Sequence, residues 1–562
     1  MVHRSLGAEL ESDDRFKCMK TILSLSYHNL PRYLKYCFLY LSIFPEGHLI
    51  ECMRLIWLWI AEGFVEEKDG RTLKEVAEGY INQLINRSLI QVARITPYDK
   101  VHLLRIHDLL RETILSKSKD QYFVAIAGEG NRRWPERVRR LSVHNSWENV
   151  QENSNISQLR SVLMFGVVDL LSNSSKLSLF CGGLRLLKVL DLRGLPLEIF
   201  PEGIVQQFNL RYLSLRRTKI RTLPTSIGQL QNLETLDLKH TFVTKLPVEI
   251  LKLHRLRHLL AYHYNNSLEP YQAFHHLQGF KALEGIGRLP SLQKLNYLEA
   301  SEASGHLMRE IGKLSQLRRL GVLKLRRQDG KVLFSSIKRL SNLRSLYVTS
   351  IREDEMIDLP YPYSPPKFLQ RLFLRGRLES LPQWISSLHG LIKLFLKWSR
   401  LREDPLETLK SLPSLVQLEL LQVYEGRTLC FKNGGFKFLN LEKMDRLERV
   451  TVEKGAMPDL ETLIIQRCNG LKKMPTGIEH LSKLKLLEFF DMPDDLITTI
   501  QPDKQGDYAK VAHIPKVYST YWRYGGWDAC SLDRLSKRQR REGPSTVIRG
   551  SSFRNWHKHG TT

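Results

Sequence analysis

Leucines recur along the chain with a constant spacing of 23 residues. Leu187, Leu210 and Leu233 each open the same LxxLxL pattern, written LKVLDL, LRYLSL and LETLDL, and Leu256 follows 23 residues later. Apolar residues that alternate with others predict a short strand with one buried face. A repeat of this length is a leucine-rich repeat, which buries its leucines only when neighbouring repeats stack on it. The pattern therefore predicts a curved solenoid whose concave face is lined by strands.

The same pattern extends well beyond these four repeats. Fifteen repeat openings can be placed, at residues 138, 159, 187, 210, 233, 256, 292, 317, 343, 369, 391, 415, 436, 460 and 484. Their spacing is 21 to 28 residues, except for a step of 36 residues from Leu256 to Leu292, where Tyr262–Asn266 and Pro270–Tyr271 are expected to form an inserted loop. The ninth position of a repeat carries a small polar group that can bond to backbone inside the stack, as at Thr218, Thr241 and Cys468.

Residues 1–125 follow a different pattern, in which apolar residues recur at helical spacing. Helices are expected after candidate caps at Ser12–Asp14, from Pro31, from about Ile50 to Glu62 and from about Leu73 to Arg87. Two extended runs then flank a predicted turn at Thr96–Asp99, and they cover Leu89–Arg94 and Lys100–Ile106. Helices followed by such a hairpin indicate a winged helix.

Composition and charge add limits to this picture. The 562 residues are 42% hydrophobic and 26% charged, which is ordinary for a globular protein, and the net charge of +26 favours an acidic protein surface, nucleic acid or anionic lipid as partner. The seven cysteines are scattered without a CxxC pair, so they suggest neither a disulfide framework nor a zinc site. The most apolar stretch, Leu55–Ile60, is too short to span a bilayer. These features favour a cytoplasmic protein, and the basic run Lys537–Arg541 leaves nuclear import open.

Specific strings in the first region carry a family resemblance. CFLYLSIFP lies within Leu25–Gly47, LIWLWIAEGF spans Leu55–Phe64, and a short Ile-His-Asp motif contains His107 and Asp108. Together with the repeats, these strings resemble the plant nucleotide-binding leucine-rich repeat disease-resistance proteins of the coiled-coil type. The segment His513–Asp528 resembles an extension that follows the repeats in some members.

The resemblance and the repeat pattern together give an expected α/β organisation. A helical winged-helix domain, part of a nucleotide-binding region, is expected over residues 1–125. A leucine-rich repeat solenoid of about 15 repeats is expected over residues 126–495, and a basic, largely disordered tail over residues 496–562. Relative to the family, the chain is expected to begin inside the nucleotide-binding region, through a real truncated form, a degenerate gene or a misplaced start codon.

The resemblance implies that His107 contacts the phosphates of bound ADP and that Asp108 supports the same turn. From the residues alone, the alternative is that Asp108 caps the following helix while His107 packs at the end of a wing strand. No GxxxxGK[ST] loop is present, because Gly312-Lys313 and Gly330-Lys331 are each followed by a residue without a hydroxyl. We therefore predict no ATPase activity and no cofactor bound by this chain alone, although ADP or ATP is implied for complete family members.

Side chains between and beside the repeat leucines should face the concave surface, because strand side chains alternate. From the middle repeats onward this rule exposes basic and aromatic residues on adjacent strands: Arg319, Tyr347, Arg371, Phe373, Arg375, Lys393, Phe395 and Lys397. Arginine and aromatic residues are common interface anchors. The alternative is that a strongly basic chain shows such stripes anywhere, and that Phe373 and Phe395 simply stack on each other across strands.

Three functions remain open on these observations. The resemblance implies an innate-immune receptor part that binds a pathogen effector, or a host protein altered by one, and whose repeats contact a nucleotide-binding domain outside this chain. A winged-helix nucleic-acid-binding protein is the alternative, but the candidate helices lack the basic face that binding would need. A non-functional truncated product is the third. No nucleophile-base motif, metal-ligand cluster or phosphate loop points to an enzyme.

Overall fold

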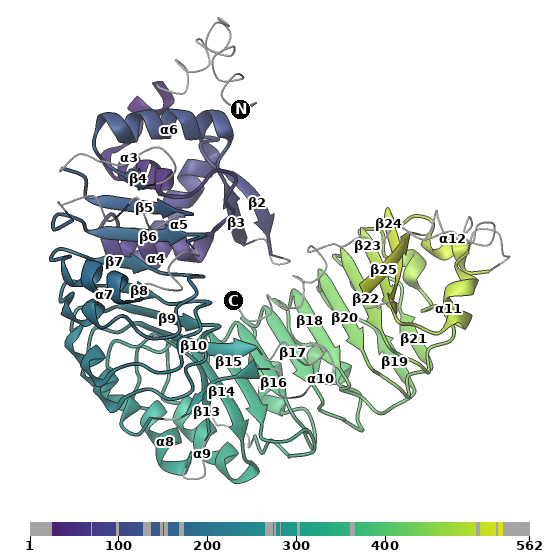
Figure 1. The fold of residues 1–562 in the computed structure, drawn as a ribbon. Coiled ribbons are helices and arrows are strands. Elements are labelled where there is room, and N and C mark those ends of the chain that lie inside the picture. The colour runs from purple at the N-terminus through teal and green to yellow at the C-terminus, as the bar shows by residue number, and fades with distance from the viewer. Residues whose placement is uncertain are drawn as a thin grey trace, which may run out of the picture. The chain divides into compact units, whose positions relative to one another are not determined.

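The computed structural model describes residues 25–68, 70–96, 100–127, 137–145, 150, 156–167, 174–264, 274, 277–281, 283–300, 304–359, 366–501, 506–523 and 526–531. The chain divides into two compact units, Met1–Glu299 and Ala300–Thr562. The first unit contains a helical domain and the first repeats, and the second contains the later repeats (Figure 1). The caps expected at Ser12–Asp14 lie outside the described residues.

The helical domain has the element order of a winged helix. Its elements are α3 (Arg32–Leu39), the 3-10 helix η1 (Tyr40–Ile43), β1 (Ile50–Glu51), α4 (Cys52–Glu62), α5 (Leu73–Asn86), β2 (Gln91–Ile95), β3 (Val101–Arg105) and α6 (Asp108–Asp120). The three strands form an antiparallel sheet in the order β1-β3-β2. The expected hairpin is therefore confirmed, although most of its turn, residues 97–99, lies outside the described residues.

One expected helix begins later than its pattern suggested. Ile50 and Glu51 form a short strand instead of a first helical turn, because they pair with Leu104 and Leu103 of β3. Helix α4 then ends at Gly63, which adopts φ 85°, a left-handed conformation that glycine reaches without steric cost.

Every predicted repeat opening lies two residues before the start of a strand. In the first unit the strands are β5 (Arg140–His144), β6 (Ser161–Phe165), β7 (Val189–Asp191), β8 (Tyr212–Ser214), β9 (Thr235–Lys239), β10 (His258–Tyr264) and β13 (Lys294–Glu299). They pair in parallel, with β4 (Ala125–Ala127) added before β5. Helix α7 (Ser174–Gly182) and 3-10 turns form return segments, the turns being η4 (Glu202–Gln206), η5 (Thr225–Gln229), η6 (Val248–Lys252) and η7 (Ile286–Arg288).

The ninth-position residues make the bonds expected of them. The hydroxyls of Thr218 and Thr241 donate to the carbonyls of Leu215 and Leu238, each at 2.8 Å. The inserted loop differs from the prediction, because Tyr262–Tyr264 extend β10 and pair antiparallel with β11 (Leu277–Gln278), which is followed by β12 (Phe280–Lys281). Residues 265–271 of the expected loop lie outside the described residues.

The second unit continues the repeat pattern. Its parallel strands are β14 (Arg319–Leu325), β15 (Ser345–Ser350), β16 (Arg371–Arg375), β17 (Lys393–Lys397), β18 (Gln417–Leu421), β20 (Phe438–Glu442), β22 (Thr462–Gln466), β23 (Leu486–Phe490) and β24 (Lys516–Arg523). Two short strands, β19 (Thr428–Phe431) and β21 (Arg449–Val452), pair separately. The return segments hold α8 (Ser304–Ile311), α9 (Arg327–Ile337), η8 (Gln383–Ser387), α10 (Leu406–Leu409) and η9 (Ile478–His480).

The boundary of the expected tail is placed too early. Beyond residue 495, the chain completes α11 (Asp494–Thr499), adds α12 (Tyr508–Val511) and forms β24, which pairs with β23 in the register of the repeats. Strand β25 (Gly526–Ser531) then turns back antiparallel along β24. The leucine pattern fades here, so the repeat period did not predict this strand pairing. Residues 532–562, including Lys537–Arg541, lie outside the described residues.

The core follows from the repeat pattern. The leucines that open the repeats are almost fully buried; Leu187, Leu210, Leu233 and Leu256 are each 0% exposed. The other side of each parallel sheet, which carries the residues between the leucines, is called the strand face below. In the first unit the apolar core of the winged helix includes Leu163, Val189, Tyr212 and Leu260 of the repeat strands. The winged helix and the first repeats therefore share one core.

Candidate functional site

Helix α4 packs on the strand face of the first repeats through a buried ion pair. The guanidinium of Arg54 donates to Asp191 Oδ2 from Nε at 2.9 Å, and its Nη2 lies 2.8 Å from the same oxygen. The side chains of Arg54 and Asp191 are 5% and 0% exposed. The arginine also lies over the rings of Phe44 and Phe165, at 5.5 and 5.4 Å from their centroids. An ion pair buried on both sides fixes where α4 meets the repeats.

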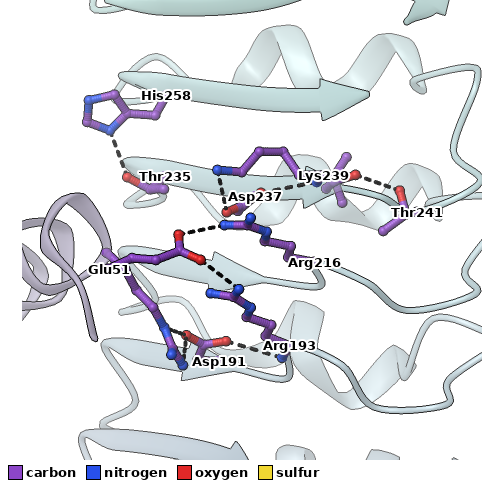
Figure 2. Close-up of polar contacts among 11 residues, drawn as sticks. Glu51, Asp191, Arg193, Arg216, Thr235, Asp237, Lys239, Thr241 and His258 are labelled. Carbon is purple, nitrogen blue, oxygen red and sulfur yellow. Dashed lines mark hydrogen bonds and ion pairs between the residues drawn. The ribbon is translucent and has the colours of Figure 1, made fainter. Parts of the chain in front are cut away.

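Glu51, the residue before α4, links to two successive repeats. Its carboxylate oxygens accept from Arg193 at 2.6 Å and from Arg216 at 2.8 Å (Figure 2). Burial would raise the pKa of Glu51, but Arg216, Arg193 and Lys239 hold that pKa well below its ordinary value. Glu51 is therefore ionised at neutral pH and acts as a bridge between the winged helix and the repeats.

At the other end of α4, a carboxylate of the winged helix again pairs with an arginine of the repeats. Glu62 accepts from Arg140 Nε at 3.0 Å and Nη2 at 2.9 Å, a bidentate pair, and from the hydroxyl of Ser161. Between the two ends, Trp57 stacks against His258 with ring centroids 5.1 Å apart. The strand face of the first repeats is thus covered by α4, so those positions are not open to another protein.

Sequence reasoning missed this junction. Asp191, Arg193, Arg216, Asp237 and Lys239 occupy strand-face positions of three consecutive repeats. Their charges are visible in the sequence, but Asp191 pairs with Arg54 on α4 across 137 positions, and Glu51, the partner of Arg193 and Arg216, is farther away still. The usable signal was the pair of opposite charges on an otherwise apolar helix, at Arg54 and Glu62.

The Ile-His-Asp motif, which the resemblance led us to expect at a nucleotide, lies at the start of α6. His107 is the N-cap residue, and its Nδ1 accepts from the backbone N–H of Leu109 at 3.4 Å. Asp108 is the first residue of the helix, so the expectation that Asp108 caps it is corrected to His107. Both side chains are exposed. The residues around His107 supply one imidazole and helix-terminal amides, which fit one phosphate group at most and do not form a nucleotide site in the absence of a phosphate loop.

The residues expected to bind a partner lie in register on neighbouring strands of the second unit. Phe373 pairs with Tyr347 on one side and Phe395 on the other. Phe373 and Phe395 stack with ring centroids 4.3 Å apart, and Tyr347 lies 5.6 Å from Phe373. The stacking alternative is therefore confirmed for these two phenylalanines, which are only 6% and 3% exposed.

The basic members of this set differ in exposure. Arg375 and Lys393 are each 4% exposed, which corrects the expectation that they are open to a partner. Arg375 packs its guanidinium over the ring of Trp398 at 4.4 Å. The remaining residues are half-buried and keep accessible surface: Arg319, Tyr347, Arg371 and Lys397.

Acidic residues on the following strands were not anticipated. Glu419 on β18, Glu442 on β20 and Glu488 on β23 point to the same strand face, because they occupy the positions between or after the repeat leucines. Burial raises the pKa of each, and that of Glu488 reaches about 7. The strand face of the second unit therefore changes from basic on β16 and β17 to acidic from β18 onward.

Other features of the described residues narrow the chemistry. Six described cysteines are free thiols: Cys37, Cys52, Cys181, Cys430, Cys468 and Cys530. Within the described ranges, no three His, Cys, Asp or Glu side chains are grouped as metal ligands. Of the helices that the structure describes, none combines the length and the apolar character needed to cross a membrane.

Comparison with known proteins agrees with these two domains. The family model for the leucine-rich repeat region matches residues 158–495, and the model for the disease resistance protein winged helix domain matches residues 43–114. The solved structure of a leucine-rich repeat protein from Leptospira interrogans is similar over 67% of this chain and 93% of that protein, at 20% identity and with a TM-score of 0.39.

Curated relatives are similar over both domains. The disease resistance protein RPM1 of Arabidopsis thaliana is 35% identical over 518 residues, which is 92% of this chain and 55% of that protein. RPP8 of the same plant is 30% identical over 91% and 56%, and Pik-2 of rice, Oryza sativa subsp. japonica, is 34% identical over 74% and 43%. The chain spans about half the length of these relatives. It belongs to the plant disease resistance proteins that join a winged helix domain to a leucine-rich repeat region.

Proposed function

We propose that this chain is the sensing part of a plant innate-immune receptor, which binds a pathogen effector or a modified host protein through the strand face of its second unit. The observation that carries the proposal is that the two strand faces differ in what covers them. The face of the first repeats is covered by α4 through Arg54 and Glu62. The face of the second unit carries the stacked rings and the partly accessible cations.

The chemistry of that second face supports a protein partner. Tyr347, Arg371 and Lys397 keep accessible surface. They lie on or beside the strands that carry the buried, stacked pair Phe373 and Phe395. Aromatic anchors flanked by cations are typical of interfaces in which a few residues supply most of the binding energy. A partner that presents carboxylates next to apolar side chains would match these strands.

A nucleic-acid-binding winged helix is less well supported. Helix α4 is covered by the repeats, and α5 carries no basic face, because Lys74 pairs with Glu78 at 2.9 Å. Duplex DNA binding requires several Lys or Arg side chains that displace counterions from the phosphates, so it would weaken steeply with salt. A salt-dependent mobility shift on duplex DNA would favour this alternative.

The proposal is tested by charge reversal on the accessible cations. Proteins labelled by proximity to the chain would be quantified in infected and uninfected leaves for the native chain and for the double variant Arg371→Glu with Lys397→Glu. A partner enriched only on infection should be lost in the double variant, because two attractive charges become repulsive. Lys410→Glu is the matched control, since Lys410 is exposed at the C-cap of α10, where it pairs with Glu407 at 2.6 Å.

The outcome can contradict the proposal in two ways. An infection-dependent partner that is retained by the double variant places the binding site elsewhere. If no protein depends on infection at all, the receptor function itself is wrong for this chain. We also propose a cytoplasmic location with nuclear entry left open, supported by the free thiols of a reducing compartment, and no enzymatic activity of the chain itself.

A further inference from the structure

A row of cations crosses three consecutive repeats beside the winged helix. Arg193, Arg216 and Lys239 occupy the same position of the repeats opened by Leu187, Leu210 and Leu233. They form one row, because neighbouring strands lie about 4.8 Å apart. Arg193 and Arg216 share the carboxylate of Glu51, and Lys239 lies 3.4 Å from Asp237 (Figure 2). Asp191 is already paired with Arg54.

Arg217 adds a fourth cation to this row. It follows Arg216 in the chain and is exposed, and its backbone N–H donates to the carbonyl of Lys239 at 2.9 Å. Burial lowers the pKa of Arg217, and repulsion from Arg193 and Arg216 lowers it further, while Glu51 opposes this effect. Four cations therefore face only two carboxylates.

Two further observations show that this charge is not balanced from within. The Nε of Arg216 is buried without a hydrogen-bond partner, and the residue is only 8% exposed. Burial lowers the pKa of Lys239 to about 8, with Arg216 and Arg193 acting in the same direction while Asp237 opposes them. A buried donor without an acceptor and crowded cations both cost free energy that a bound anion would recover.

The groups packed around the row do not supply that anion. His48 and His102 approach from the winged helix, and burial and nearby arginines lower the pKa of each, so both are neutral at neutral pH. His240 follows Lys239, and burial and Arg216 lower its pKa to about 3. Its ring packs on Tyr262 and Tyr264 instead, with centroids 5.3 and 5.5 Å away.

We propose that Arg193, Arg216, Arg217 and Lys239 form a binding site for a small anion that carries two or more negative charges, as a phosphate or pyrophosphate group does. Guanidinium groups pair with phosphate oxygens through two parallel N–H bonds. A compact anion between several guanidinium groups would accept from the N–H donors that a single carboxylate cannot reach. The site is distinct from His107 and from the strand face of the second unit. Because Glu51 bridges α4 to the same arginines, the anion would bind at the junction between the winged helix and the repeats.

The test is titration of the full chain with sodium pyrophosphate, followed by calorimetry at fixed ionic strength, with inorganic phosphate as the weaker probe. One saturable site is expected. Arg217→Ala should weaken pyrophosphate binding at least tenfold, because one of the four cations is removed. The guanidinium of Arg217 is exposed, so its loss should leave the fold intact. Lys219→Ala is the matched control, as Lys219 is exposed and pairs only with Glu198 at 3.3 Å. That variant should bind like the native chain.

A second variant separates anion binding from a structural role. Glu51→Gln removes the carboxylate that competes for Arg193 and Arg216, so pyrophosphate should bind more tightly to this variant. A merely structural role of Glu51 would leave affinity unchanged or lower it. Circular dichroism melts would check that each variant remains folded. The absence of a saturable site, an Arg217→Ala variant that binds normally, or an equal loss in Lys219→Ala would each overturn the proposal.

Discussion

Removing the carboxylate of Asp191 should detach α4 from the repeats. In Asp191→Ala, Arg54 keeps its buried position but loses both contacts to Asp191 Oδ2, at 2.9 and 2.8 Å. The backbone N–H of Arg193 also loses its acceptor, Asp191 Oδ1, at 3.1 Å. The variant therefore leaves a buried charge without a counterion at the centre of the junction.

The expected cost follows from the burial of both partners. Breaking a buried pair by removing one member costs about 3–5 kcal/mol, because the remaining charge stays in a medium that solvates it poorly. The two side chains are 5% and 0% exposed, so solvent screening does not reduce that figure. Contacts of Arg54 with Phe44 and Phe165 remain and place the expected value near the lower end.

Hydrogen exchange on the amides of α4 measures this cost locally, apart from the stability of the second unit. A loss of about 3–5 kcal/mol corresponds to exchange that is faster by between about 100-fold and several thousand-fold. The double variant Arg54→Met with Asp191→Leu removes both charges and fills the space. It should exchange more slowly than Asp191→Ala, because no unpaired charge remains.

Two results would refute this reasoning. The first is a change below about 1 kcal/mol in Asp191→Ala, which is the size expected for an exposed pair. The change in stability of Glu198→Ala, which removes one member of the exposed pair Lys219 and Glu198, provides that reference. The second is a double variant that is less stable than the single one, since the pair would then contribute more than the charge it leaves behind.

Three further changes test the packing of the two units. Burial and neighbouring arginines lower the pKa of His48 and His144 to about 4 and that of His240 to about 3. The folded protein therefore favours the neutral imidazoles. Its free energy of unfolding is unaffected by these groups above pH 6.5 and decreases as the pH falls from there toward 4. Each should contribute on the order of 1 kcal/mol after screening, seen as a lower urea midpoint at pH 4.5 than at pH 7. Gly477→Ala should cost more than about 1 kcal/mol, because φ is +83° and the added Cβ would lie 1.9 Å from the carbonyl oxygen of Val452. Thr241→Val should cost about 1–2 kcal/mol in the same assay, since the carbonyl of Leu238 loses the hydroxyl donor and the backbone N–H of Val243 loses its acceptor at 3.4 Å.

Each of these changes has a counterpart that should be nearly neutral. Gly390→Ala meets no atom within 4 Å and needs no positive φ, so a comparable loss there would contradict the steric argument. Thr225→Val removes an exposed hydroxyl from η5. His144→Phe should flatten part of the acid dependence, and an unchanged pH profile would show that this imidazole is not responsible.

The accuracy of the sequence analysis differed between the scaffold and the candidate sites. The repeat openings were placed correctly, each two residues before a strand, because the LxxLxL pattern is local and its alternating part fits a strand with one buried face. The start of α4 was missed by two residues, because Ile50 and Glu51 pair with a strand about fifty positions away. The capping role of His107 rather than Asp108 was missed because either residue type can cap a helix.

For the candidate sites, the sequence determined which residues lie on the strand face but not what covers them. The alternation of side chains assigned Phe373, Arg375, Lys393 and Phe395 to that face correctly, and only the structure showed that they are buried. The sequence alone thus determined the repeat register, the winged helix and the family resemblance. Tertiary structure decided that α4 covers the first repeats, since Arg54 and Asp191 meet across 137 positions. Contacts at that separation depend on how whole elements pack, which no local pattern of residues encodes.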